Sequence, residues 1–142
     1  MVAPRRLHVK VGYANFHRGC DMQSNDPVRQ VVAAIIVNNN IYMGVNEIPE
    51  VTMLNPVWKN REAIRVIATH AEVNAVRAAL QDGVTDFKNA VLFVTLHPCD
   101  SCMQMIRALG IETVYYNEDY VPSKSGVKYD TARRVNVSKV SK

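Results

Sequence analysis

Two short motifs set the strongest constraint on how this chain can fold. The segments His70-Ala71-Glu72 and Cys99-Asp100-Ser101-Cys102 together offer one imidazole, two thiolates and a separate carboxylate. Zinc at a catalytic site typically takes three protein ligands and leaves its fourth position to water, which the metal charge makes acidic enough to form hydroxide near neutral pH. The fold must therefore bring the histidine to the two cysteines. Glu72 lies too close in sequence to the histidine to be a separate ligand, so we expect it to move protons to and from that water.

The residues alone leave two other uses of the cysteines open. A Cys-x-x-Cys pair can be a redox pair or half of a structural zinc site. A structural site needs four ligands, and His97 is awkwardly close to Cys99 to share a tetrahedron with it. A redox pair does not need an upstream His-x-Glu motif. The third cysteine, Cys20, is expected to be a small buried hydrophobic residue.

Length and composition indicate a globular protein. We expect one zinc-dependent domain over residues 1–142, because a chain of this length can bury a core without disulfides. Hydrophobic residues make up 48% of the chain, which argues against disorder. We expect no membrane span and no signal peptide. Thiolate ligands need a reducing compartment, so the predicted location is the cytoplasm, or the host cytoplasm for a viral protein.

The positive charge of the chain is concentrated near its ends. The formal net charge is +4, yet residues 20–120 hold 7 basic and 12 acidic residues. Residues 1–19 carry a net charge of +4, and residues 121–142 carry +5. The central part is therefore acidic, which argues against nucleic acid as the main partner, although basic ends can still steer an anionic substrate.

The first half of the sequence predicts a helix and a hairpin. Apolar residues at helical spacing favour a helix over 9–23. The β-branched run 31–37 and the segment 41–45 predict two strands joined by a turn at 38–40. Residues 46–69 show no clear periodicity and are expected to be a long connection, and loops of this length in compact domains are often functional.

The second half predicts alternating helices and strands. A helix should run from His70 to Gly83, followed by a strand over 90–95, a helix over 99–109 and a strand over 111–116. This order favours parallel pairing of the two strands. A last short helix is expected around 130–135. All three metal-ligand candidates then fall at helix starts, where unpaired N–H groups stabilise thiolates.

The His-x-Glu and Pro-Cys-x-x-Cys motifs are those of zinc-dependent nucleobase deaminases. Over about residues 12–120 the chain resembles the cytidine/deoxycytidylate deaminase superfamily, most closely its deoxycytidylate (dCMP) deaminase branch. The resemblance is carried by these segments: Ser24-Asn25-Asp26-Pro27, Gly44-Val45-Asn46-Glu47-Ile48-Pro49, His70-Ala71-Glu72-Val73-Asn74-Ala75 and Thr95-Leu96-His97-Pro98-Cys99-Asp100-Ser101-Cys102. It implies an α/β, three-layer cytidine-deaminase-like fold, a five-stranded mixed sheet flanked by helices.

The resemblance also implies roles for individual residues. Its zinc ligands are His70, Cys99 and Cys102, and its proton shuttle is Glu72. Substrate contacts would come from further residues: Asn46 to the sugar hydroxyl, Arg29 to the phosphate, the backbone at Ala71 to the pyrimidine, and His97 to the base or phosphate. Other roles remain open: turn capping for Asn46, a solvated charge at the start of the strand for Arg29, and packing for His97.

The sequence departs from the family pattern at two places. Val31-Val32-Ala33 stands where Val-Gly-Ala is common, and Gly44-Val45-Asn46-Glu47 stands where Gly-Tyr-Asn-Gly is common. The second change affects the loop near the effector site of allosteric members, so the sequence leaves open whether dCTP and dTTP regulate this protein.

These observations predict an enzyme that converts dCMP to dUMP with Zn²⁺ as cofactor. Three alternatives remain: a deaminase of 5-methyl-dCMP or dCTP, a deaminase of a base in RNA or single-stranded DNA, and a non-catalytic nucleotide-binding homologue. A retained Glu72 argues against the last. Expected partners are the nucleotide and further copies of the chain, in a dimer or hexamer, with neither membrane nor nucleic acid.

Overall fold

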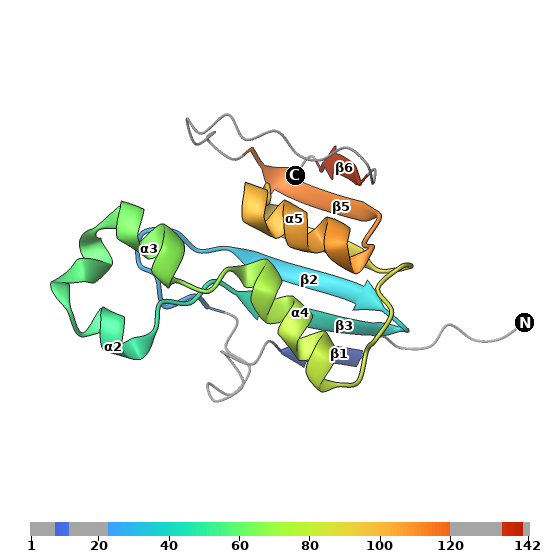
Figure 1. Ribbon diagram of the computed structural model, residues 1–142, viewed down its shortest axis with the longest axis horizontal. Helices are drawn as coiled ribbons and strands as arrows, with labels where there is room; N and C mark the ends of the chain where they lie inside the picture. Colours follow the sequence, from blue (N-terminus) through green and yellow to red (C-terminus); the bar gives the residue numbers. More distant parts are fainter. Residues whose placement is uncertain (1–7, 12–22, 120–134, 141–142) are drawn as a thin grey trace, which may run out of the picture.

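The computed structural model describes residues 8–11, 23–119 and 135–140, which form a mixed six-stranded sheet with helices α4 and α5 on one face (Figure 1). The order of the strands across the sheet is β1-β3-β2-β4-β5-β6. The strands are β1 His8–Val11, β2 Val32–Val37, β3 Asn40–Val45, β4 Val91–Leu96, β5 Thr113–Glu118 and β6 Asn136–Lys139. The helices are α2 Glu50–Met53, the 3-10 turn η1 Pro56–Lys59, α3 Arg61–Ile67, α4 Ala71–Gln81 and α5 Asp100–Leu109.

The strand directions bring several chain segments together at one end of the strands. Strand β2 is antiparallel to both of its neighbours, β3 and β4. The outer pairs, β1 with β3, β4 with β5 and β5 with β6, are parallel. The start of β2 therefore lies beside the carboxyl ends of β3 and β4. The segments around residues 29, 46 and 97 meet there.

The turn between β2 and β3 is fixed by two asparagines. Asn38 and Asn39 have positive φ angles of 53° and 63°, and Val37 pairs with Asn40 across the turn. A two-residue hairpin with both central residues in the left-handed region matches the twist of the strands, and asparagine tolerates that conformation better than most residues. The turn sets the register that puts Ala33, Ile35 and Val37 on the buried face.

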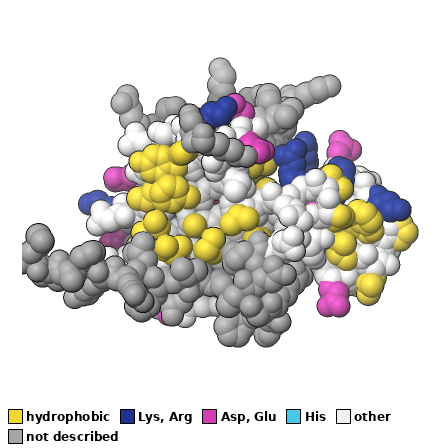
Figure 2. Space-filling view, turned by 180° about the vertical axis from the view of Figure 1, so that it is seen from behind, with side chains coloured by type: hydrophobic (Ala, Val, Ile, Leu, Met, Phe, Trp, Pro, Cys, Tyr) yellow, Lys and Arg dark blue, Asp and Glu magenta, His cyan; other side chains and the backbone are white. Residues whose placement is uncertain are grey.

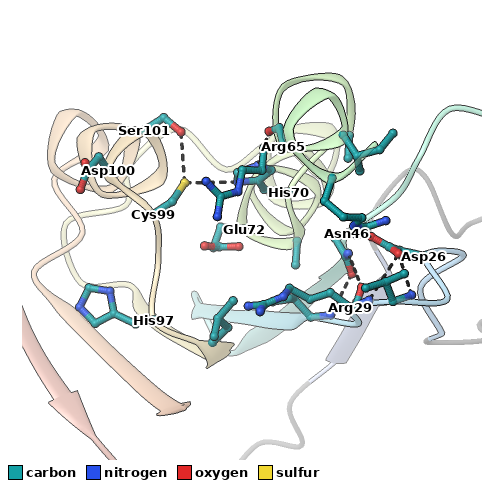
Figure 3. A pocket seen from close by; sticks show the side chains of 17 residues that line it. Asp26, Arg29, Asn46, Arg65, His70, Glu72, His97, Cys99, Asp100 and Ser101 are labelled. Atoms are coloured by element: carbon teal, nitrogen blue, oxygen red, sulfur yellow. Dashed lines mark hydrogen bonds and ion pairs between the residues drawn. The ribbon is translucent and has the colours of Figure 1, made fainter. Parts of the chain in front are cut away.

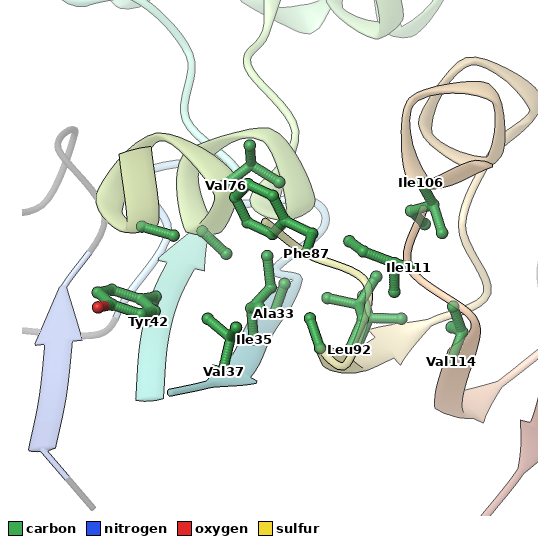
Figure 4. Packing of buried hydrophobic residues seen from close by; sticks show 14 of the residues in the cluster. Ala33, Ile35, Val37, Tyr42, Val76, Phe87, Leu92, Ile106, Ile111 and Val114 are labelled. Atoms are coloured by element: carbon green, nitrogen blue, oxygen red, sulfur yellow. The ribbon is translucent and has the colours of Figure 1, made fainter. Parts of the chain in front are cut away.

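The core lies between the sheet and the two helices, as the close view in Figure 4 shows. The inward side chains of β2 and β4 alternate with outward ones, so that Ile35 and Leu92 are buried. The close view also shows Val76 of α4 and Ile106 of α5 among the residues in this cluster. Burial of these side chains supplies the main stabilisation of the fold.

Helix α4 lies so close to β3 that only glycine fits at the contact. A Cβ atom on Gly44 would lie 2.5 Å from the carbonyl oxygen of Ala71 and 2.4 Å from the amide nitrogen of Ala75. The buried side chain of Asn74 donates a hydrogen bond to the carbonyl of Val45 at 2.7 Å. This contact fixes the depth and orientation of the first turns of α4.

Most of the predicted elements are confirmed. The mixed α/β sheet with flanking helices is present, and the hairpin, α4, β4, α5 and β5 lie within a few residues of their predicted bounds. The predicted parallel pairing of β4 with β5 is also present. The described residues contain two layers of the predicted three, the sheet and the helices α4 and α5.

The predictions for the two ends of the chain fare differently. The helix predicted over 9–23 is wrong at its start, because residues 8–11 form β1 and pair with β3; residues 12–22 lie outside the described part. The helix predicted around 130–135 falls almost wholly outside it too. Strand β6 was not predicted, and it extends the expected five strands to six by pairing with β5.

The long connection predicted over 46–69 is present, and it contains three short helical elements that the sequence did not indicate, α2, η1 and α3, beyond one end of the sheet (Figure 1). Asn55 and Asn60 cap η1 and α3 by accepting hydrogen bonds from the backbone of Val57 and Ala63. Short capped turns of this kind do not produce long-range periodicity, which explains why the pattern of apolar residues missed them.

The face of the sheet opposite α4 and α5 carries a group of apolar side chains (Figure 2). Phe93 and Tyr115 stack there with ring centroids 5.1 Å apart, and Phe93 is 40% exposed. No helix in the described part of the chain has both the length and the apolar character needed to cross a membrane.

Replacing Gly44 with alanine should displace α4. We expect Gly44→Ala to lower the free energy of unfolding by about 1–3 kcal/mol, because the new methyl group would overlap helix backbone that cannot move alone. Chemical denaturation measures this change. Gly83→Ala is the control, since no atom lies within 4 Å of its Cβ position and only its φ of +90° opposes the change. It should cost about 1 kcal/mol, and a Gly44→Ala protein no less stable than this control would contradict the close contact.

Candidate active site

The three predicted metal ligands meet between the first turns of α4 and α5. His70 immediately precedes α4, Cys99 immediately precedes α5, and Cys102 lies one turn into α5. The Nδ1 atom of His70 is 3.2 Å from the Sγ atom of Cys102 and 3.4 Å from that of Cys99. One possible ligand atom from each residue lies within 4.8 Å of the others. The helix starts suit this cluster because their free N–H groups favour thiolates.

His70 is oriented by a backbone carbonyl on its other side. Its Nε2 atom lies 3.3 Å from the carbonyl oxygen of Arg65, and a carbonyl can only accept, so Nε2 carries the proton. That carbonyl is available because the amide of Thr69, which would bond to it in a longer helix, donates instead to Glu47 at 2.8 Å. Nδ1 is thereby directed toward the cysteines, where it can bind zinc once it has lost its own proton.

Proton sharing within the cluster shifts the pKa values of its members. The pKa of Cys99 is lowered to about 3, chiefly by a hydrogen bond from Cys102. The pKa of Cys102 is raised, mainly because its thiol donates to Cys99 and is buried. The pKa of His70 is raised to about 9, first by its hydrogen bond to Cys99. Without a metal the site therefore holds one thiolate and two protons at neutral pH.

The donor set fits zinc. One imidazole and two thiolates are typical zinc ligands, and within the described residues no fourth His, Cys, Asp or Glu joins this group. Three protein ligands leave one coordination position for a small molecule, which is the arrangement of a catalytic zinc rather than a structural one.

Glu72 lies beside this cluster but is almost sealed from solvent. Its exposed fraction is 4%, and burial raises the pKa of its carboxyl group above the usual range for glutamate. In Figure 3 its carboxylate points into the cavity below His70 and Cys99. A carboxyl group with a raised pKa, next to the site where water would bind a metal, is suited to accepting and returning a proton.

A cavity of about 560 Å³ opens in front of these groups. This volume is typical of sites for small molecules. Seven of the eight predicted site residues line it. The eighth, Cys102, belongs to the cluster of candidate metal ligands. The lining residues include Arg29, Asn46, His70, Ala71, Glu72, His97 and Cys99.

Asn46 is tied to the backbone that precedes β2. Its Oδ1 atom accepts a hydrogen bond from the amide of Val31, and its Nδ2 atom donates to the carbonyl of Arg29, both at 2.8 Å. The amide still has a second N–H and a second lone pair to offer a ligand. Asn46 therefore holds the segment that carries Arg29 and also faces the cavity.

His97 sits where β4 ends. Its Nδ1 atom donates to the carbonyl of Pro98 at 2.8 Å, and its ring meets Tyr116 edge-on with centroids 4.7 Å apart. These contacts fix the ring and leave Nε2 for a ligand. The packing and ligand-binding interpretations of His97 are therefore compatible.

Two arginines of the cavity, Arg61 and Arg65, were not among the predicted site residues. Both lie on α3, in the connection that was predicted to be irregular. The signal that could have revealed the helix was Asn60, a capping residue followed by Glu62 in the first turn. Arg61 pairs with the buried carboxylate of Asp26 at 2.5 Å, which links α3 to the start of β2.

The comparisons with known proteins agree with this geometry. The family model described as "Cytidine and deoxycytidylate deaminase zinc-binding region" matches residues 17–118. The deoxycytidylate deaminase of Enterobacteria phage T2 is 35% identical over 69 residues, which is 49% of this chain and 34% of that protein. The human deoxycytidylate deaminase is 30% identical over 105 residues, 68% of this chain and 57% of that protein. The chain thus matches about a third to just over half of the length of these relatives.

A solved structure shares the fold over most of both chains. The dCMP deaminase of the cyanophage S-TIM5, determined in complex with dCMP and dUMP, superposes with a TM-score of 0.59 at 26% sequence identity. The match covers 82% of this chain and 85% of that one.

Zinc binding should depend steeply on pH. Because His70 and Cys102 carry protons in the metal-free site, zinc must displace about two protons at neutral pH. We expect the apparent affinity to rise by up to about a hundredfold per pH unit between pH 7 and 8, and less steeply above the His70 pKa. Chelator competition at several pH values measures the slope. A histidine with its ordinary pKa would already have lost its proton above pH 7, and the slope would be about one decade per pH unit.

The control is Cys102→Ala, which removes one ligand and its proton. This protein should bind zinc much more weakly and release about one proton fewer. A freshly purified native protein without zinc by elemental analysis would contradict the metal centre itself.

Proposed function

The chain belongs to the cytidine and deoxycytidylate deaminase zinc-binding family, and on that premise we propose that it hydrolyses dCMP to dUMP and ammonia. The observation that carries the proposal is one cavity that joins a three-ligand metal cluster, a buried carboxyl group and an exposed arginine. Relatives named deoxycytidylate deaminase support the choice of substrate.

We propose that His70, Cys99 and Cys102 hold the zinc. When bound, zinc supplies the Lewis acidity that makes water nucleophilic near neutral pH. The raised pKa of Glu72 then suits it to take a proton from the attacking water. It passes this proton to the ring nitrogen of cytosine as the C4–O bond forms. It then moves the second proton of the water to the amine on the tetrahedral carbon, so that the C4–N bond breaks and ammonia leaves.

The other cavity residues position the nucleotide in this proposal. The backbone at Ala71, beside the metal cluster, meets the edge of the pyrimidine ring. Asn46 uses its spare amide hydrogen and lone pair for a sugar hydroxyl, and the fixed ring of His97 borders the base or the phosphate. Arg29 binds the phosphate, since a guanidinium can donate two parallel hydrogen bonds to phosphate oxygens. Assembly into a dimer or hexamer and a cytoplasmic location stay predictions from the sequence.

Glu72→Gln should separate chemistry from structure. The amide keeps the shape of the side chain but cannot accept a proton, so we expect kcat for dCMP to fall by about 10²–10⁴-fold. Zinc content and thermal stability should be kept, because no ligand is removed. Steady-state kinetics, elemental analysis and thermal denaturation measure the three quantities.

The control for this variant is Glu62→Gln, an exposed glutamate on α3 that does not line the cavity. It should leave kcat unchanged. A Glu72→Gln protein that deaminates dCMP at the native rate would assign proton transfer to another group.

Arg29→Ala should weaken the preference for the nucleotide. The native protein is expected to prefer dCMP over deoxycytidine, and loss of one charge-assisted contact should shrink the ratio of their kcat/KM values by about tenfold or more. Arg77→Ala, an exposed arginine of α4 outside the cavity, is the matched control and should leave the ratio unchanged. An equal loss on both substrates would make Arg29 structural, and a native preference for the nucleoside would overturn dCMP as substrate.

A further inference from the structure

We propose that Arg65 is a second phosphate-binding residue and thus a determinant of nucleotide specificity. This inference rests on the proposed function, because it names a further contact of the same substrate. Arg65 lies on α3 and lines the cavity together with Arg29, which comes from the segment before β2. In Figure 3 the side chains of these two arginines lie on opposite sides of Glu72.

The charges around the cavity fall into compensated and uncompensated groups. Arg61 is compensated, because its guanidinium pairs with Asp26, whose side chain is only 3% exposed. A zinc ion held by two thiolates and a neutral imidazole would form a group with no net charge. Neither set is available to neutralise an incoming anion.

Arg29 and Arg65 are the uncompensated cations. Within the described part of the chain no carboxylate forms an ion pair with either of them, and both are exposed at the cavity. Three acidic groups share the lining, Asp26, Glu72 and Asp100. Asp26 pairs with Arg61, Glu72 is only 4% exposed, and Asp100 stands in the first turn of α5, where the helix start partly balances its charge. The free positive charge of the cavity therefore resides on two guanidinium groups.

A nucleoside monophosphate supplies the matching anion. Its phosphate carries a charge of about −1.5 to −2 near pH 7 and offers three strongly accepting oxygens. One guanidinium cancels only part of this charge and engages two oxygens at best. A second guanidinium on the opposite wall completes both the charge balance and the hydrogen bonding.

The position of Arg65 is set by its backbone rather than by its side chain. Its carbonyl accepts from His70, and α3 is held to the body of the protein through Arg61 and Asp26. The Arg65 backbone is therefore fixed beside the candidate metal cluster, while its guanidinium can move to bind a ligand. Truncating the side chain keeps the carbonyl, so its effect on phosphate can be measured apart from any effect on His70.

The experiment compares Arg65→Ala and Arg65→Lys with the native protein. For Arg65→Ala we expect the ratio of kcat/KM for dCMP to that for deoxycytidine to fall by about tenfold, mostly through KM. Binding of dUMP, measured by calorimetry, should weaken by a similar factor relative to deoxyuridine. Lysine should restore part of the preference, because it keeps the charge but not the planar pair of donors. Zinc content should stay native in both variants.

Arg77→Ala and Val66→Ala are the controls, the first for loss of an exposed arginine and the second for a change at an exposed position of α3. Neither should alter the ratio. A native preference for dCMP that survives in Arg65→Ala as in these controls overturns the inference alone. Loss of zinc in Arg65→Ala would make its role structural and overturn it too. A native protein with no preference for dCMP overturns the proposed function and this inference with it.

Discussion

The contact between α4 and β3 at Gly44 is the constraint on which the site depends. The helix backbone lies where a Cβ atom on Gly44 would be, with the carbonyl of Ala71 at 2.5 Å from that position. Because Ala71 stands between His70 and Glu72, the depth of α4 on the sheet sets the height of both functional side chains. A larger residue at this strand position would move a metal ligand and the proposed proton carrier together, away from the cysteines of α5.

The first turn of α4 also carries a buried ionisable group, at a cost to stability. Glu72 is 4% exposed, and burial raises the pKa of its carboxyl group, so the charged form is disfavoured in the folded protein. A group with this raised pKa contributes most to stability at low pH and least once pH rises through its folded-state pKa. A raised pKa suits the proton-transfer role proposed for Glu72, and the loss of stability accompanies it.

The buried carboxylate of Asp26 connects two segments that line the cavity. One oxygen of Asp26 accepts from the amide of Val28, and the other pairs with Arg61 on α3. Through this pair α3 stays against the body of the protein, where the Arg65 carbonyl orients His70. The connection over residues 46–69 thus supports the candidate metal site and also lines the cavity. This gives a physical reason for a long connection at this point of the fold.

The sequence by itself determined the family and most of the elements. The His-x-Glu and Cys-x-x-Cys motifs indicated the candidate metal ligands. Apolar periodicity, with a turn at Asn38-Asn39 and helix ends at Gly83 and Gly110, predicted the hairpin, α4, β4, α5 and β5. These signals act over a few residues and can therefore be read locally. Strands β1 and β6 were missed since they are defined by pairing with β3 and β5, to which no local pattern points. Only the tertiary structure decided that Arg61 is neutralised by Asp26, while Arg29 and Arg65 line the cavity and form no ion pair with a carboxylate of the described residues. A long charged side chain pairs with whichever opposite charge the fold places within its reach. The distance between the two groups depends on tertiary packing and cannot be read from their spacing in the sequence.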